Sequence, residues 1–120
     1  MAKTERMRKI QTVLKDWLLK SLAKERVIEA FWICFNNYRA EDPEEFIEYF
    51  PDYEKEYISF EYSKASITLR GWDRLDNSNN ENMECIETLI SVLYKGVYLG
   101  YYTLVYNNQG EIIDDRLVWV

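Results

Sequence analysis

The hydrophobic pattern of this chain changes period at Pro51, and this change constrains the fold more than any other feature of the sequence. Before Pro51, apolar residues recur at steps of three and four, which is typical of helices. After Pro51 they alternate with polar residues, which is typical of half-buried strands. The sequence therefore predicts helices first and an antiparallel sheet second, an α+β fold.

The first third of the chain is predicted to be one long helix, because no proline or glycine occurs before Pro43. An unbroken helix from Thr4 to Tyr38 would be ~50 Å long, which is too long for a compact domain of this size. We therefore expect a kink or break within residues 21–26, where Ser21 offers a weak cap, or first turns that project from the body.

A second, short helix is predicted to begin at Pro43 and to end near Tyr49. Asp42 is a favourable N-cap, proline suits the first helical position, and Glu45 stands where a capping box places an acid. Some of the acidic residues here therefore serve to start the helix.

Five strands in an antiparallel meander are expected after Pro51. Two short ones form a hairpin linked by residues 63–65, and a polar, Asn-rich loop follows at residues 73–82. Lys95-Gly96 and residues 107–110 are predicted to be the later turns. The predicted strands are 58–62, 66–69, 85–94, 97–106 and 112–119.

Length and composition predict one domain, residues 1–120, with ample apolar content for a core. The sequence contains neither a signal-peptide h-region nor an apolar stretch of ~20 residues that would span a membrane, so a cytoplasmic location is expected. The net charge of −6 argues against nucleic-acid binding.

No catalytic, cofactor or metal motif is present in the sequence, and no cofactor is expected. The chain has no histidine, and its two cysteines, Cys34 and Cys85, lack metal-ligand spacing. Asp114 and Asp115 are adjacent on a predicted strand, so their side chains face opposite sides and cannot act as a dyad. We therefore expect a protein that is not an enzyme.

Three stretches of the chain resemble the NTF2-like (cystatin-like) superfamily. Residues 27–42 followed by PEEFIEYF look like its long first helix, break and short second helix. Residues 57–69 look like its first hairpin, and residues 86–119 look like its final strands. The chain departs from the family where a further helix usually precedes the later strands, because only residues 71–82 are available there. The resemblance implies a cone-shaped cavity, but it carries over no catalytic residue.

The charge is unevenly distributed along the chain, and this asymmetry is the main indication of function. Eight bases against three acids lie in residues 1–26, whereas nine acids lie in residues 41–61. Acids mixed with tyrosines are typical of inhibitors that cover a basic protein surface. The leading hypothesis is a small acidic immunity- or antitoxin-type protein that binds a basic partner through Glu44, Glu45, Glu48, Tyr49, Asp52, Tyr53, Glu54, Glu56 and Tyr57. Capping and solubility are the simpler interpretation of these acids.

The sequence is also compatible with two alternative functions. One is a small-ligand pocket of the NTF2-like type, lined by Phe60, Ile90, Tyr102 and Trp119. The other is a homodimer or assembly factor that uses residues 1–20, a basic amphipathic arm. This arm could also pack near the acidic residues 41–61, either within one chain or between two chains. The apolar stripe of this arm comprises Met7, Ile10, Leu14, Trp17 and Leu18.

Overall fold

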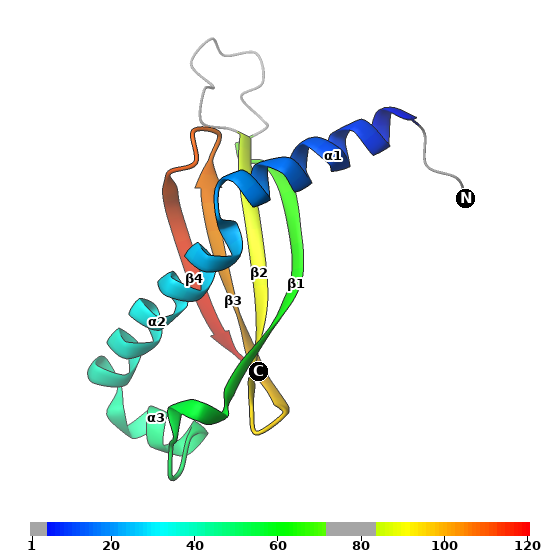
Figure 1. Ribbon diagram of the computed structural model, residues 1–120. Coiled ribbons are helices and arrows are strands. Elements are labelled where there is room, and N and C mark those ends of the chain that lie inside the picture. The colour runs from blue at the N-terminus through cyan, green and yellow to red at the C-terminus, as the bar shows by residue number, and fades with distance from the viewer. Residues whose placement is uncertain (1–4, 72–83) are drawn as a thin grey trace.

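The structure, a computed structural model, describes residues 5–71 and 84–120. It contains three helices and one four-stranded antiparallel sheet, so the predicted α+β class is confirmed. Helix α2 (Ala23–Glu41) crosses one face of the sheet, while α1 (Glu5–Lys20) and α3 (Pro43–Tyr49) lie at opposite ends of the molecule (Figure 1).

The predicted long first helix is two helices, so the described chain has three helices rather than two. The break falls at Ser21 and Leu22, inside the expected range. Leu22 adopts a left-handed conformation with φ 54°, and it is Leu22, not Ser21, that precedes the first residue of α2. The αL residue turns the chain and lets α2 pack on the sheet while α1 runs off in another direction.

Helix α3 begins and ends as predicted, between Asp42 and Phe50, with Pro43 in its first turn. The Asp42 side chain makes no capping hydrogen bond, so the predicted capping box is wrong in this detail. Asp42 is also the last capping residue of α2, and its backbone N–H donates to the carbonyl of Tyr38. The pattern predicts that Phe46, Ile47 and Phe50 are buried. Phe46 and Phe50 are, whereas Ile47 is exposed.

The sheet has four strands rather than the five predicted, and their order follows the sequence as in a meander. The expected hairpin around residues 63–65 is a single strand, β1 (Ile58–Leu69), that contains a bulge between Tyr62 and Lys64. Both halves of β1 pair with β2 (Glu84–Tyr94). One extra residue shifts the alternation of inward and outward side chains in the same way that a turn does, which explains the error.

The remaining strands, β3 (Val97–Asn107) and β4 (Ile112–Trp119), agree with the prediction. Lys95 and Gly96 both have positive φ in the tight turn between β2 and β3. The predicted loop at residues 73–82 lies outside the described residues.

The core fills the space between α2, α3 and one face of the sheet. Phe31 and Phe35 of α2 are fully buried, and the Phe31 ring lies 5.8 Å from that of Tyr102 in β3. Such ring pairs, in edge and stacked arrangements, occur throughout the core and stabilise it beyond the burial of area alone. Among the described residues, the buried core cluster joins α2 and α3 to strands β2 and β3, and half-buried side chains of β1 and β4 pack against it.

Helix α1 is attached to this core mainly by Trp17, whose ring packs edge-on against Tyr106 at 5.3 Å. Its side chains Val13 and Leu19 are exposed, and the helix extends beyond the sheet (Figure 1). Because α1 and α3 lie at opposite ends of the molecule, the described part of the basic arm, from Glu5 onward, does not pack on the acidic segment of its own chain.

Candidate functional site

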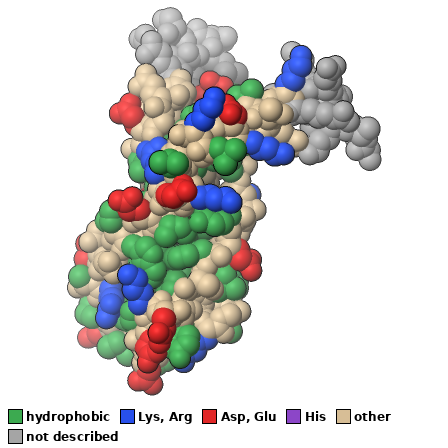
Figure 2. Space-filling view, in the orientation of Figure 1, with side chains coloured by type: hydrophobic (Ala, Val, Ile, Leu, Met, Phe, Trp, Pro, Cys, Tyr) green, Lys and Arg blue, Asp and Glu red, His purple; other side chains and the backbone are tan. Residues whose placement is uncertain are grey.

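A run of acids begins at the end of α2, follows α3 and continues to the short 3₁₀ helix at Lys55–Tyr57. Residues 41–56 hold eight acids, and none of them forms an ion pair within residues 5–71 and 84–120. All but Glu45 are exposed. Acidic side chains accordingly lie at the end of the molecule formed by α3 (Figure 2).

The two bases among residues 39–57 are held against aromatic rings. The Arg39 guanidinium lies 5.0 Å from the ring centroid of Phe46 and 4.8 Å from that of Tyr53. The Lys55 ammonium lies 4.7 Å from the ring of Trp32. These cation–π contacts position both bases without pairing them to the nearby carboxylates. The surface therefore keeps a strong local negative charge.

A groove of about 870 Å³ opens between α2, α3 and β4. Its lining includes four acidic residues and one basic residue, Arg116. The acids come from three elements or their ends: Glu41 and Asp42 from the α2–α3 junction, Glu45 from α3 and Asp115 from β4. The groove therefore brings Asp115 together with acidic side chains that precede it by seventy or more positions in the sequence.

Aromatic rings form one wall of the groove. The Trp119 ring at the end of β4 lies 5.8 Å from the rings of both Tyr38 and Tyr49. Gly100 faces Trp119 across the β3–β4 ladder, and a Cβ at this position would collide with the carbonyl of Val118 and the indole ring. The absence of a side chain at Gly100 thus leaves room for Trp119.

Asp115 connects the groove to the core. Its carboxylate accepts a hydrogen bond from the Tyr102 hydroxyl at 2.8 Å. Burial, together with this carboxylate, raises the pKa of Tyr102 and raises the pKa of the Cys34 thiol from 9.0 to about 11. A thiol with so high a pKa is a poor nucleophile, so Cys34 is not suited to covalent catalysis.

The Tyr38 hydroxyl is a buried polar atom in the wall of the groove. It makes no hydrogen bond with the described residues. Burial, and then the nearby Glu45 carboxylate, raise the pKa of Tyr38. An unpaired buried hydroxyl is unfavourable, so Tyr38 adds a local cost to the stability of this wall of the groove.

The structure divides the predicted partner-binding residues between two sides of α2. Glu45 and Tyr49 line the groove beside β4, whereas Glu54 and Glu56 lie in a cleft with Trp32 on the side of β1. Tyr53 is half-buried and packs against Phe35, Phe46 and Phe50, so part of its side chain lies against the core. The exposed remainder comprises Glu44, Glu48, Asp52 and Tyr57.

The four residues predicted to line a pocket lie in the packed core or against it. The Phe31 ring of α2 packs on this face of the sheet, 4.9 Å from the ring of Phe60 and 5.8 Å from that of Tyr102. A different cavity, of about 280 Å³, lies between the α1–α2 junction and strands β1 and β2. Ile90 lines it, as do Leu18, Val27 and Tyr62. Hydrophobic side chains also gather across the middle of this face, between α2 and β1 (Figure 2).

The predicted arm interface lies partly outside the described residues, because the side chains of Met7 and Ile10 are not described. Leu14, Trp17 and Leu18 are half-buried. Trp17 contacts the chain's own Tyr106, and Leu18 lines the 280 Å³ cavity.

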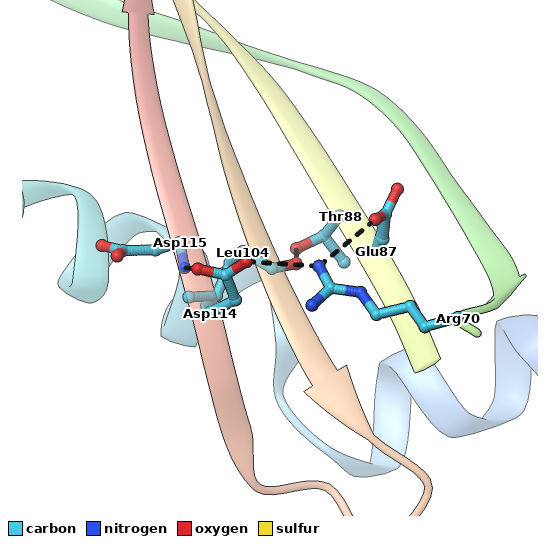
Figure 3. A network of polar contacts seen from close by, with 6 residues as sticks. All are labelled: Arg70, Glu87, Thr88, Leu104, Asp114 and Asp115. Atoms are coloured by element: carbon cyan, nitrogen blue, oxygen red, sulfur yellow. Dashed lines mark hydrogen bonds and ion pairs between the residues drawn. The ribbon is translucent and has the colours of Figure 1, made fainter. Parts of the chain in front are cut away.

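The carboxylates on the other face of the sheet are engaged in ion pairs. Arg70 at the end of β1 reaches across β2 and β3, placing Nη2 3.9 Å from Glu87 and 3.3 Å from Asp114 (Figure 3). Asp114 and Asp115 point to opposite sides of β4, as the sequence predicts. This network is exposed cross-strand pairing, which contributes little to stability.

Sequence reasoning missed the groove itself, and with it Cys34, Asn37, Tyr38, Glu41, Asp42, Asp115 and Arg116. One signal was present, because Cys34, Tyr38 and Glu41 are spaced by four and three and therefore share one side of α2. Their position opposite β4 depends on how α2 crosses the sheet, which spacing does not reveal.

No group of three or more acidic or cysteine side chains in the described chain is placed to hold a metal ion. The helices described are also too short or too polar to cross a membrane. Searches of known protein families, curated proteins and solved structures find no match to this chain.

Proposed function

We propose that this chain is a non-enzymatic protein-binding module that covers a basic surface of another protein, in the manner of a small acidic immunity or antitoxin-type inhibitor. The observation that carries the proposal is the unpaired charge of residues 41–56. Eight acids there lack an ion pair among the described residues, while Arg39 and Lys55 stack on rings.

Physical reasons favour a protein as the partner. Clustered charge of one sign speeds the encounter with a surface of the opposite sign. Aromatic residues beside the acids, such as Tyr49 and Trp119, supply contact area at a low entropic cost. A nucleic acid would be repelled by the same charge.

Charge reversal on α3 tests the proposal. Glu44 and Glu48 are exposed and one helical turn apart, so the double variant Glu44→Lys/Glu48→Lys changes the surface without disturbing the core. Partners are captured from an extract of the source cells with tagged wild-type protein at low and at high salt, and identified by mass spectrometry. We expect a basic partner that is lost at high salt, because surface charges are screened.

The double variant should bind this partner at least about tenfold more weakly than wild type does. The matched control, Glu29→Lys/Glu61→Lys, makes the same change in net charge at two exposed sites away from α3. Equal affinity of the two variants for the partner would exclude the acidic surface as the binding site.

The 280 Å³ cavity favours a second candidate function, the binding of a small apolar ligand. Its volume lies near the lower end of the range for ligand pockets, roughly 300–1,000 Å³, and its lining is mainly apolar.

Ala65→Trp would fill the cavity, whereas Ser59→Trp adds the same ring at an exposed position of β1. If the cavity binds apolar ligands, the neutral dye N-phenyl-1-naphthylamine should fluoresce with wild type and Ser59→Trp but not with Ala65→Trp. Equal fluorescence from all three proteins would contradict this function.

A further inference from the structure

Strand β4 is an edge of the sheet, and its outer side faces the acidic groove. Among the described strands, β4 pairs with β3 alone. The groove is lined by five consecutive residues of β4, from Asp115 to Trp119. Because neighbouring side chains of a strand point to opposite faces, five residues in a row can line one groove only if it runs along the strand's backbone edge.

The direction of the β4 backbone groups follows from its hydrogen bonds. Val120 donates its N–H to the carbonyl of Leu99, so the backbone groups of Val120 point toward β3. In an antiparallel ladder the direction alternates along the strand. Leu117 and Trp119 therefore direct their N–H and C=O groups outward, into the groove. Asp115 also points outward, but its N–H is taken by the Asp114 carboxylate at 2.9 Å.

The other edge of the sheet is less suited to pairing. Strand β1 is interrupted at its middle by the bulge between Tyr62 and Lys64, and the exposed Lys64 follows directly. Bulges and lysines are features that block the addition of a strand at a sheet edge. Between Asp114 and Trp119, by contrast, the β4 register is regular.

Charge indicates the kind of segment that fits the edge of β4. The facing wall of the groove contributes Glu41 and Asp42 at the end of α2 and Glu45 on α3. Asp115 adds a fourth acid from β4, against Arg116 as the single base of the lining. A strand beside β4 would have alternate side chains on the helix side of the sheet, within reach of these carboxylates.

We propose that the partner inserts an extended basic segment into this groove as a fifth strand, paired with the outer edge of β4. Main-chain hydrogen bonds to Leu117 and Trp119 supply affinity, and lysine or arginine side chains facing Glu41, Glu45 and Asp115 supply specificity. This inference rests on the proposed function, since it names how the basic partner is held.

The test uses the full chain and a defined probe, a peptide of about seven residues, a typical strand length, that alternates lysine and valine. All lysine N–H groups of such a strand point to one edge and all valine N–H groups to the other. Two further peptides carry backbone N-methyl groups, one at its lysines and one at its valines. Affinities are measured by isothermal titration calorimetry.

Strand addition predicts that one methylated peptide binds at least about tenfold more weakly than the parent peptide, while the other binds within about threefold. The reason is that only the peptide edge facing β4 needs free N–H groups to donate hydrogen bonds to it. Equal effects of the two methylations, whether both peptides bind or both fail, would overturn the inference, because recognition would not depend on one edge.

The charge requirement is tested with the same parent peptide. Glu41→Lys/Glu45→Lys should weaken its binding by at least about tenfold, whereas Glu29→Lys/Glu61→Lys should leave it unchanged. Equal weakening by both variants would overturn the assignment to the groove. The two claims can fail separately. If the peptides show no dependence on one edge but Glu44→Lys/Glu48→Lys no longer captures the partner, strand addition is excluded and the proposed function is retained.

Discussion

At the scale of single residues, Asp114 and Asp115 show how one strand serves two surfaces. Asp114 pairs with Arg70 on the face of the sheet that is away from α2. Asp115 accepts the Tyr102 hydroxyl hydrogen bond and lies near Cys34 at the groove. Alternation along a strand predicts this division, but the partners of each carboxylate depend on packing between distant segments.

The reactivity of Cys34 tests the placement of Asp115. Burial first, and the Asp115 charge second, raise the thiol pKa from 9.0 to about 11. At neutral pH the thiolate fraction is then ~100-fold smaller than for a thiol with the lower value. In a Cys85→Ala background, Asp115→Asn should speed alkylation by iodoacetamide about 3- to 10-fold, because it removes a negative charge that disfavours the thiolate.

The adjacent residue provides the control for this measurement. Asp114→Asn makes the same chemical change on the opposite face of β4 and should leave the alkylation rate unaltered. If Asp115→Asn reacted no faster than the Cys85→Ala parent, Asp115 would not lie beside Cys34 as described.

At the scale of elements, the conformation of Leu22 separates α1 from α2. A left-handed conformation costs an L-residue roughly 1–2 kcal/mol, and glycine avoids this cost. Leu22 is 59% exposed, so little packing is lost on its removal. Leu22→Gly should therefore raise the free energy of unfolding by about 0.5–1 kcal/mol, measured by urea denaturation, in spite of glycine's greater freedom in the unfolded chain.

Lys15→Gly is the comparison, because Lys15 is also exposed but lies in the middle of α1. Glycine in a helix interior should lower the free energy of unfolding by about 1 kcal/mol. A loss of similar size from Leu22→Gly would show that the break does not depend on a left-handed residue.

Most elements were predictable from local pattern. The start of α3 at Pro43, the turn at Lys95-Gly96 and the strands after residue 84 all follow from short-range rules. The error at Ser63 has a physical cause, since a bulge and a hairpin turn both shift the two-residue alternation. Only pairing with β2 distinguishes them, and pairing is a long-range property.

At the scale of the whole molecule, the candidate site is less predictable than the fold. The acids were visible as a run in the sequence, but α2 separates Glu45 in the groove from Glu54 and Glu56 in the cleft beside Trp32. Tyr53 was expected at the surface and is half-buried against the core. The way α2 and α3 pack on the sheet decides these positions.

The NTF2-like resemblance stays a prediction. The stretch at residues 57–69 that was compared with the first hairpin of that superfamily contains a single strand.

The most direct test of the central claim is amide hydrogen exchange, read by mass spectrometry, on the full chain with and without its captured basic partner. If the partner covers the acidic surface and pairs with the outer edge of β4, exchange should be slower in the complex over residues 41–57 and 114–119. Slower exchange confined to α1 and β1, with residues 41–57 and 114–119 unaffected, would contradict the central claim.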